Sequence, residues 1–328
     1  MATVRGFIRS YGAAVRRAER EQQRRAKEAA RRYKEQLKQE EIANSAEAVA
    51  NYNQYVELIQ SIHKNCTDEI DWNQIKETRA PRETTKQTTY ETEARGKLNK
   101  YRPSVFDKIL GSTNKKIKQM EDLIVDGKRR DEENFKIAQK KYLEELEDWQ
   151  FLQKLAEGLE KKSPQSYQDA LQYFDLFSDI EELGTQIEFL ISDNQVDVDV
   201  HINSEEIVPS YELKQTARGQ LSKKDMAKGK FNELYQDHVC SSIIRVSREL
   251  FAYLPLDKAR VNAIGQVLNS ETGHLEERPI LSVVMVPETI NSLNMEAIDP
   301  SDSMRNFVHN MKFSKTKGFS PVEKVELK

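Results

Sequence analysis

The sequence VDVDVHI, residues 196–202, decides the fold of the second half of this chain. An apolar β-branched residue alternates with a polar one at every step, which is the period of a strand with one buried face. Asp197, Asp199 and His201 therefore share the face opposite the valines. Two aspartates on one face also make this strand a candidate functional site.

The residues around this strand predict a complete domain over 163–328. Further strands are predicted over 187–191, 207–216, 261–267 and 280–286. Helices are predicted over 165–183, 230–254 and around 302–311. The order αβββαββα indicates an α+β fold with a mixed sheet. We expect the first three strands to form a meander and the helix over 230–254 to cross over onto the same sheet.

The first half of the chain is charged and its apolar positions have helical spacing. Of all 328 residues, 32% are charged, and the mean hydropathy is −0.76, which favours an extended helical part beside a smaller packed domain. We expect a long basic helix over 1–66, an exposed linker over 67–103 and a helical or coiled-coil segment over 104–162.

Aromatic and small residues recur every seven positions in the third of these segments, at Phe135, Tyr142, Trp149 and Ala156. This spacing is typical of a coiled-coil seam. Gly127 precedes the seam and fits either the end of one helix before an antiparallel return or the interior of one continuous helix. The sequence leaves both arrangements open.

A second acidic motif follows the aspartate strand, in Tyr211-Glu212-Leu213-Lys214. Glu212 and Lys214 share one strand face, as Asp197 and Asp199 do. Carboxylates on neighbouring strands suit Mg²⁺ or Mn²⁺, which prefer hard oxygen ligands. Such a metal polarises a phosphodiester and lowers the pKa of bound water, while a lysine steadies the developing charge.

This arrangement resembles the restriction-endonuclease-like PD-(D/E)xK superfamily. The resemblance implies that Asp197, Asp199 and Glu212 bind the metal and that Asp199, Glu212 and Lys214 are catalytic. The chain departs from the family pattern, because no Pro-Asp precedes the first acid and Pro209 falls within the proposed Glu-x-Lys strand. Residues 206–327 also resemble an uncharacterised bacterial protein family, which implies no activity.

The alternative interpretation of the same four residues is structural. Asp197, Asp199, Glu212 and Lys214 then form the solvated face of a hairpin and are joined by cross-strand charge pairs. In a sequence this rich in charge, a Glu-x-Lys spacing also arises by chance.

A basic N-terminal segment is the other candidate site. Residues 1–41 hold twelve Lys or Arg against six Asp or Glu. The candidate nucleic-acid-binding residues are Arg16, Arg17, Arg20, Arg24, Arg25, Arg31 and Arg32. They indicate sequence-independent contact with a phosphate backbone. The alternative is a solvated helix with i,i+4 pairs, such as Glu28 with Arg32.

Two distant cysteines and the absence of any long apolar run favour a cytoplasmic protein with no transmembrane segment. The function we expect is nucleic-acid binding, by a metal-dependent nuclease or a degenerate nuclease-like protein in a bacterial defence or DNA-processing complex. The alternative is a non-enzymatic coiled-coil scaffold or adaptor whose C-terminal domain docks a protein partner. In either case we expect a homo-oligomer or a component of a multi-protein complex.

Overall fold

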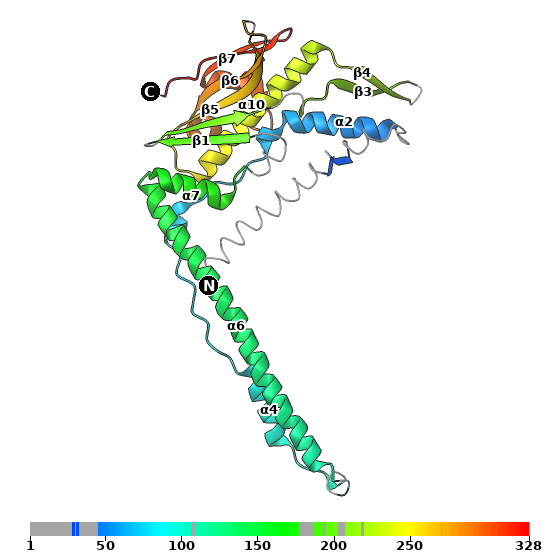
Figure 1. The fold of residues 1–328 in the computed structure, drawn as a ribbon, viewed down its shortest axis with the longest axis vertical. Helices are drawn as coiled ribbons and strands as arrows, with labels where there is room; N and C mark the ends of the chain where they lie inside the picture. Colours follow the sequence, from blue (N-terminus) through cyan, green and yellow to red (C-terminus); the bar gives the residue numbers. More distant parts are fainter. Residues whose placement is uncertain are drawn as a thin grey trace. The chain divides into compact units, whose positions relative to one another are not determined.

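The computed structural model describes residues 28–29, 31–32, 45–105, 109, 111–177, 186–192, 195–202, 207–217, 220–269 and 271–327. These residues fall into two compact units (Figure 1). The first comprises residues 73–154, and the second comprises the described residues before 73 and after 154. The fold is α+β, as the sequence predicts.

The helical unit is built on one long helix, α6 (Thr113–Glu160). The preceding residues run antiparallel to it: Gln153 Nε2 donates to the Ile75 carbonyl at 2.7 Å, and Thr84 Oγ1 donates to the Ala138 carbonyl at 3.3 Å. These residues end in α4 (Thr89–Lys100), which lies beside α6 in Figure 1. α4 thus occupies 12 of the residues 67–103, where we expect an exposed linker.

Gly127 lies inside α6, so residues 113–160 form one helix and the hairpin alternative is wrong. The glycine is needed because α4 begins against it: a Cβ atom at Gly127 would lie 2.8 Å from the Tyr90 carbonyl oxygen. The heptad-spaced Phe135, Tyr142 and Trp149 are half-buried. Trp149 donates to the Thr78 carbonyl at 3.2 Å, so this chain's own extended segment contacts that face.

The second unit contains a six-stranded sheet in the order β1-β2-β5-β6-β7-β8. Its strands are β1 (Gln186–Ser192), β2 (Gln195–His201), β5 (Ala259–Leu268), β6 (Leu275–Met285), β7 (Val308–Ser314) and β8 (Gly318–Ser320). β2 and β5 pair in parallel, and the other neighbours pair antiparallel. The crossover that a parallel pair requires contains α10 (Lys228–Tyr253), as predicted.

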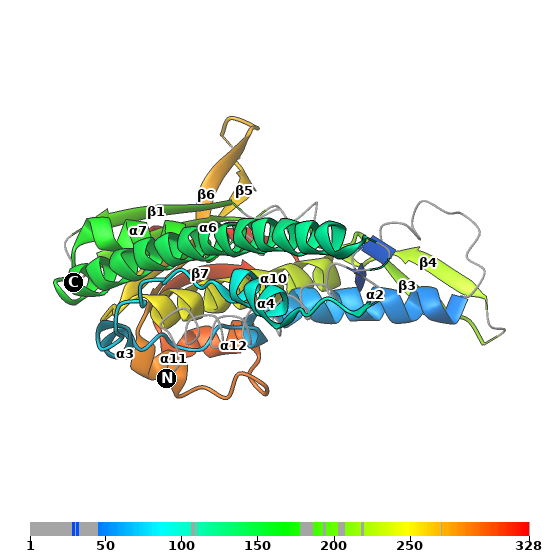
Figure 2. The same cartoon turned by 90° about the horizontal axis from the view of Figure 1, so that it is seen from below.

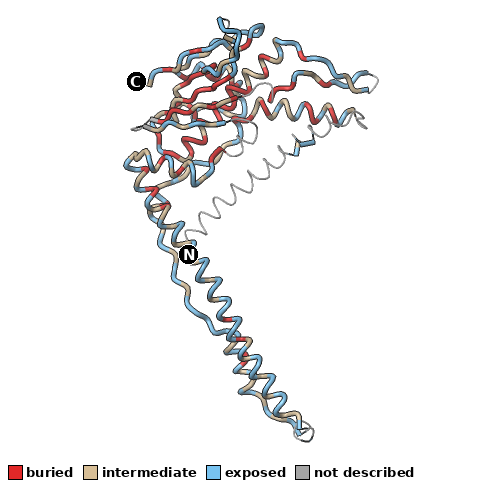
Figure 3. The backbone as a smooth tube through the Cα atoms, viewed as in Figure 1, coloured by how far each residue is buried: buried red, intermediate tan, exposed pale blue. Residues whose placement is uncertain are grey.

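α10 is the central helix of this unit, and 16 of its 26 residues are buried. It contacts β5, and it also contacts α2 (Ser45–Gln60), η1 (Ile62–Lys64), α11 (Pro287–Asn291) and α12 (Pro300–Ser303). Figure 2 shows α11 and α12 on the side of α10 away from the sheet. Covered on both sides, α10 lies in the middle of the core, where Figure 3 shows most of the buried residues.

The remaining helices of the described residues are short. α3 (Trp72–Lys76), α7 (Pro164–Phe174) and η2 (Met304–Asn306) complete the set. The predicted helix over 165–183 is described only to residue 177, and its helical part ends at Phe174. The helix expected around 302–311 is wrong beyond Asn306, because residues 308–314 alternate between exposed and half-buried positions, as a strand does.

The predicted meander is also wrong in its third strand. β3 (Tyr211–Gln215) does not join β2 but pairs antiparallel with β4 (Leu221–Asp225) in a separate hairpin. The hairpin packs on α2, where the Tyr52 hydroxyl donates to the Tyr211 carbonyl at 3.0 Å. Pro209 precedes β3, so its missing N–H costs this strand no ladder bond.

Candidate functional site

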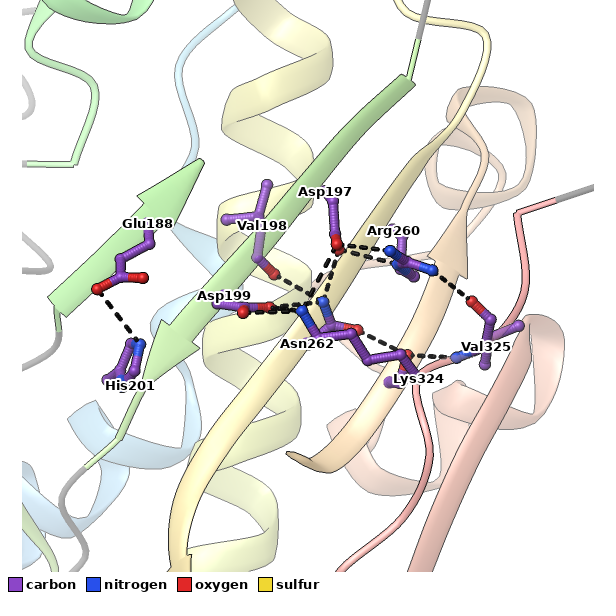
Figure 4. A network of polar contacts seen from close by, with 10 residues as sticks. Glu188, Asp197, Val198, Asp199, His201, Arg260, Asn262, Lys324 and Val325 are labelled. Atoms are coloured by element: carbon purple, nitrogen blue, oxygen red, sulfur yellow. Dashed lines mark hydrogen bonds and ion pairs between the residues drawn. The ribbon is translucent and has the colours of Figure 1, made fainter. Parts of the chain in front are cut away.

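Asp197 and Asp199 lie on one face of β2, as the alternation predicts, and Figure 4 shows them inside a polar network. Both carboxylates accept hydrogen bonds from one amide nitrogen, Asn262 Nδ2, at 2.7 and 2.8 Å. Arg260 binds Asp197 through two nitrogens, at 2.9 and 2.5 Å. The parallel register places Arg260 opposite Asp197 and Asn262 opposite Asp199, so β5 supplies a partner at each step.

The fifth member of the network, Lys324, comes from the C-terminal segment. Its Nζ lies 2.7 and 2.8 Å from the two Asp199 oxygens and 3.5 Å from Asp197 Oδ2. An ammonium among three carboxylate oxygens occupies the place that a metal ion would take between two acids. The segment itself is held by Val325, whose N–H donates to Ser282 Oγ and whose carbonyl accepts from Arg260, both at 2.9 Å.

These contacts determine the charge state of Asp197. Burial alone raises the pKa of this carboxyl, but the hydrogen bonds from Arg260 and Asn262 and the Lys324 charge outweigh burial and lower the pKa below its usual value. The carboxylate is therefore ionised and already has its counterions. A buried acid with two cationic partners holds two strands and a terminal segment together without any further ion.

Glu212 and Lys214 lie on β3, in the other sheet. Glu212 Oε1 accepts from Lys230 at the start of α10, and Glu212 Oε2 lies 3.4 Å from Lys214 Nζ. The hydrogen bond from Lys230 is the main cause of the lowered pKa of Glu212. In the part of the chain that the structure describes, no three His, Cys, Asp or Glu residues lie close enough to hold a metal ion.

The structure therefore separates the predicted residues into two groups. Asp197 and Asp199 belong to the sheet network, while Glu212 and Lys214 belong to the surface of the β3–β4 hairpin. Each group is neutralised by lysine or arginine, as the structural alternative predicts. Its solvated hairpin face is wrong, because Asp197 is buried and pairs with Arg260 of β5, and no pair joins β2 to β3. The resemblance also allows Glu181 or Glu182 to supply a further acid, but both lie outside the described residues.

Lysines gather around the hairpin and the first turns of α10. The described residues within 210–230 and 308–320 hold eight lysines and two acids, Glu212 and Asp225. We call these lysines the lysine platform: Lys214, Lys223, Lys224, Lys228, Lys230, Lys312, Lys315 and Lys317. All eight are exposed.

Two contacts at the start of α10 bring the parts of the lysine platform together. Lys230 pairs with Glu212 of β3, and Asn232 Nδ2 donates to the Lys315 carbonyl at 2.6 Å in the turn between β7 and β8. Gly229 also lies near this turn, since a Cβ atom there would be 3.7 Å from the Lys315 carbonyl oxygen. The hairpin and the β7–β8 turn therefore both contact the positive end of a long helix.

Most of the predicted N-terminal arginines lie outside the described residues, namely Arg16, Arg17, Arg20, Arg24 and Arg25. Arg31 and Arg32 are exposed. Arg32 Nη2 lies 3.4 Å from Glu28 Oε1, which is the i,i+4 pair that the sequence suggests. This ion pair gives Arg32 a partner within its own helix. It does not test the predicted contact of these arginines with a nucleic-acid backbone.

Sequence reasoning missed Arg260, Asn262 and Lys324. Asn262 could have been found, because it lies on the predicted strand over 261–267, and Arg260 lies two positions earlier on the same face, one residue before that predicted strand begins. Lys324 gives no comparable signal in a segment without regular structure. The lysine platform was partly visible in the pairs Lys223-Lys224 and Lys228-x-Lys230, but not its approach to residues 312–317.

No family model, curated protein or solved structure matches this chain. Among the described helices, none is both long enough and apolar enough to cross a membrane.

Proposed function

We propose that this protein binds nucleic acid through the phosphate backbone and that the lysine platform carries this binding. The observation that supports the proposal is the gathering of eight exposed lysines around the N-terminal end of α10, with three acids among them: Glu212, Asp225 and Glu233, which pairs with Lys315. One of these acids, Glu212, is paired with Lys230 and Lys214 and so orients two of the lysines. Phosphates neutralised by such a surface release counterions, which drives association.

The chemistry of this surface favours contact without base reading. Lysine ammonium groups bind phosphates as point charges and carry no sequence information. Tyr211, the aromatic residue of the hairpin, stacks on Tyr52 with ring centroids 6.2 Å apart, and Lys223 Nζ lies 4.2 Å from the centre of its ring. Because Tyr52 and Lys223 already contact this ring, it is a poor stacking platform for a base.

The geometry gives less support to the rival functions. A metal-dependent nuclease that uses Asp199, Glu212 and Lys214 needs these residues around one ion, and they lie in two sheets with separate counterions. A coiled-coil scaffold needs an open seam, and the chain's own segment contacts the heptad-spaced face of α6. The exposed lysines can contact a phosphate backbone without any change in the fold.

The proposal is tested by the salt dependence of DNA binding. We expect a fluorescent duplex of arbitrary sequence to bind the full chain, with affinity falling steeply between about 50 and 200 mM salt. The triple variant Lys224→Glu, Lys228→Glu and Lys317→Glu should flatten the slope of log K against log salt by up to about 3, since each lost phosphate contact removes about 0.9.

A matched control carries the same charge change in the helical unit, at Lys115, Lys118 and Lys136, which are exposed on α6. This control should keep the wild-type slope. If both triple variants weaken binding equally, net charge rather than the lysine platform is responsible, and the proposal fails. It also fails if the wild-type chain binds no duplex at the lowest salt.

A cleavage assay tests the separation of the predicted catalytic residues. Plasmid is incubated with the wild-type chain and Mg²⁺ or Mn²⁺, beside Glu212→Ala and Lys214→Ala. We expect the two variants to show the same metal-dependent cleavage as the wild type, or none in all three proteins. Cleavage by the wild type that disappears in both variants would restore the nuclease interpretation.

A further inference from the structure

The end of the helical unit where α4 meets the start of α6 lies outside the lysine platform, and it combines exposed aliphatic side chains with basic ones. α4 and α6 run antiparallel, since Tyr90 at the beginning of α4 lies against Gly127. The last turn of α4 therefore lies beside the first turns of α6 (Figure 1). Residues 101–112 connect the two helices at this end.

Two aliphatic residues of this connection, Val105 and Ile109, have the most exposed large apolar side chains among the described residues, at 71% and 75%. Gly111 follows them, and a Cβ atom added there would meet no atom within 4 Å. Single exposed aliphatic residues are normal on a protein surface. Two of them four residues apart, at the end of a unit, form an apolar surface that gains free energy when a partner removes it from water.

Basic residues flank these aliphatic side chains in α4, in the connection and in α6. The described residues within 96–120 hold six lysines or arginines and no aspartate or glutamate. All six are exposed: Lys97, Lys100, Arg102, Lys115, Lys116 and Lys118. The rest of α6, over 121–160, holds twelve acids and seven bases, so the positive charge is confined to one end of the helix. We call these six basic residues, with Val105 and Ile109, the basic apex.

Positive charge around exposed aliphatic side chains favours an anionic lipid surface over a nucleic acid. A phosphate backbone would neutralise the lysines, but it gives Val105 and Ile109 no apolar medium to enter. A bilayer offers both, because its charged headgroups lie directly above its acyl chains. Burial of apolar side chains at this boundary and attraction to anionic headgroups act together in membrane binding.

We propose that the basic apex docks the protein on an anionic lipid bilayer, with Val105 and Ile109 entering the boundary between headgroups and acyl chains. The lysines and Arg102 lie at the level of the headgroups and contact their negative charges, while their aliphatic stems lie along the apolar boundary. The lysine platform belongs to the other unit, so docking at the basic apex does not depend on duplex binding.

Co-sedimentation of the full chain with large vesicles tests the proposal. We expect vesicles of phosphatidylcholine with about 30% phosphatidylserine to bind the chain at least about tenfold more tightly than phosphatidylcholine alone. Val105→Ser with Ile109→Ser should weaken binding to the anionic vesicles at least about tenfold, because two aliphatic side chains no longer leave water. Lys100→Gln, Lys115→Gln and Lys118→Gln together should weaken it by about fivefold per lysine.

Matched controls lie elsewhere on α6. Ile137→Ser with Leu143→Ser replaces two exposed aliphatic side chains. Lys128→Gln with Lys136→Gln and Lys154→Gln removes three exposed charges. Both control variants should bind the anionic vesicles as the wild type does, and an equal loss in an apex variant and its control would overturn the proposal.

Equal binding of the wild type to both kinds of vesicle, or binding to neither, would also overturn it. So would unchanged binding by Val105→Ser with Ile109→Ser, because charge alone would then account for the contact. The triple lysine-to-glutamine variant of the basic apex should still bind the DNA duplex as the wild type does. Loss of duplex binding with unchanged vesicle binding would assign the basic apex to nucleic acid instead of lipid.

Discussion

His238 is a buried histidine whose protonation opposes folding. It lies in α10 and is fully buried, with Nδ1 3.1 Å from the Ile59 carbonyl oxygen. Burial lowers its pKa to about 4, although the hydrogen bond to Ile59 acts in the other direction. In the unfolded chain the pKa of histidine is about 6.5. Between these values the unfolded state binds more protons than the folded state does.

The free energy of unfolding should therefore fall as the pH drops from about 6.5 to about 4, by up to about 1.4 kcal/mol per pH unit for this proton. His238→Gln removes the titrating ring and should reduce the pH dependence in this window, whatever it does to stability at pH 7. Urea unfolding at several pH values measures the effect, and His274→Gln at an exposed turn is the control. An unchanged slope in His238→Gln would contradict the assignment.

The sequence predicted the positions of the two aspartates but not their partners. Alternation alone places Asp197 and Asp199 on one strand face, because the side-chain period of a strand is fixed. Their partners depend on the parallel register of β2 with β5 and on the return of the C-terminal segment, which brings Lys324 to Asp199 across 125 residues. No local sequence pattern encodes such long-range pairings. The sequence therefore predicted a metal site at Asp197 and Asp199, where the structure has ion pairs.

At the scale of elements, α4 depends on a cap supplied by another helix. The N–H groups of Tyr90 and Glu91, which have no partner within α4, donate to the two oxygens of Asp131 at 3.1 and 2.8 Å. Thr88 occupies the N-cap position and makes no such bond with its side chain. Asp131 is buried on α6, so one carboxylate both caps α4 and joins the two helices.

Asp131→Ala should destabilise the helical unit by about 1–2 kcal/mol, the cost of losing a cap and leaving two backbone donors unpaired. Asp131→Asn should cost less, because its amide oxygen still accepts one bond. Asp122→Ala, at an exposed position of the same helix, is the control. Urea unfolding followed by Trp149 fluorescence, with Trp72→Phe in every variant, measures all three, and equal midpoints for Asp131→Ala and Asp122→Ala would show that the cap contributes nothing.

This dependence also explains why the sequence did not reveal α4. Ala94 is its one buried residue, so the apolar spacing that identifies a helix is absent. Its support comes from Asp131, which is forty residues away, and from the i,i+4 pair of Glu91 with Arg95 at 2.8 Å. Helices with a full apolar face, such as α10, were predicted correctly, because most of the apolar residues with helical spacing there are also buried.

At the scale of the whole molecule, the two units differ in how much apolar surface they bury. Among the described residues of the helical unit, the buried apolar ones are few: Ile75, Ala94 and Leu152. The α+β unit buries most of α10 and the inner face of its sheet, including Ile243, Leu250 and Leu281 at 0% exposure. Hydrophobic burial is the main favourable term in folding, so the two units should differ in stability.

The two tryptophans of the chain provide one reporter for each unit. Trp149 donates to the Thr78 carbonyl in the helical unit, and Trp72 donates to the Tyr253 carbonyl at 2.9 Å in the α+β unit. In Trp72→Phe the remaining fluorescence follows the helical unit, and in Trp149→Phe it follows the α+β unit. We expect the Trp149 signal to be lost at a lower urea concentration, because fewer apolar side chains must be exposed there.

Far-UV circular dichroism of the wild-type chain is the internal check on these variants, since it should show both transitions in one sample. Helix lost in the first transition belongs to α4 and most of α6, while strand signal should persist until the second. Coincident midpoints by both reporters and by circular dichroism would mean that α6, which runs from Thr113 to Glu160, couples the units into one cooperative structure.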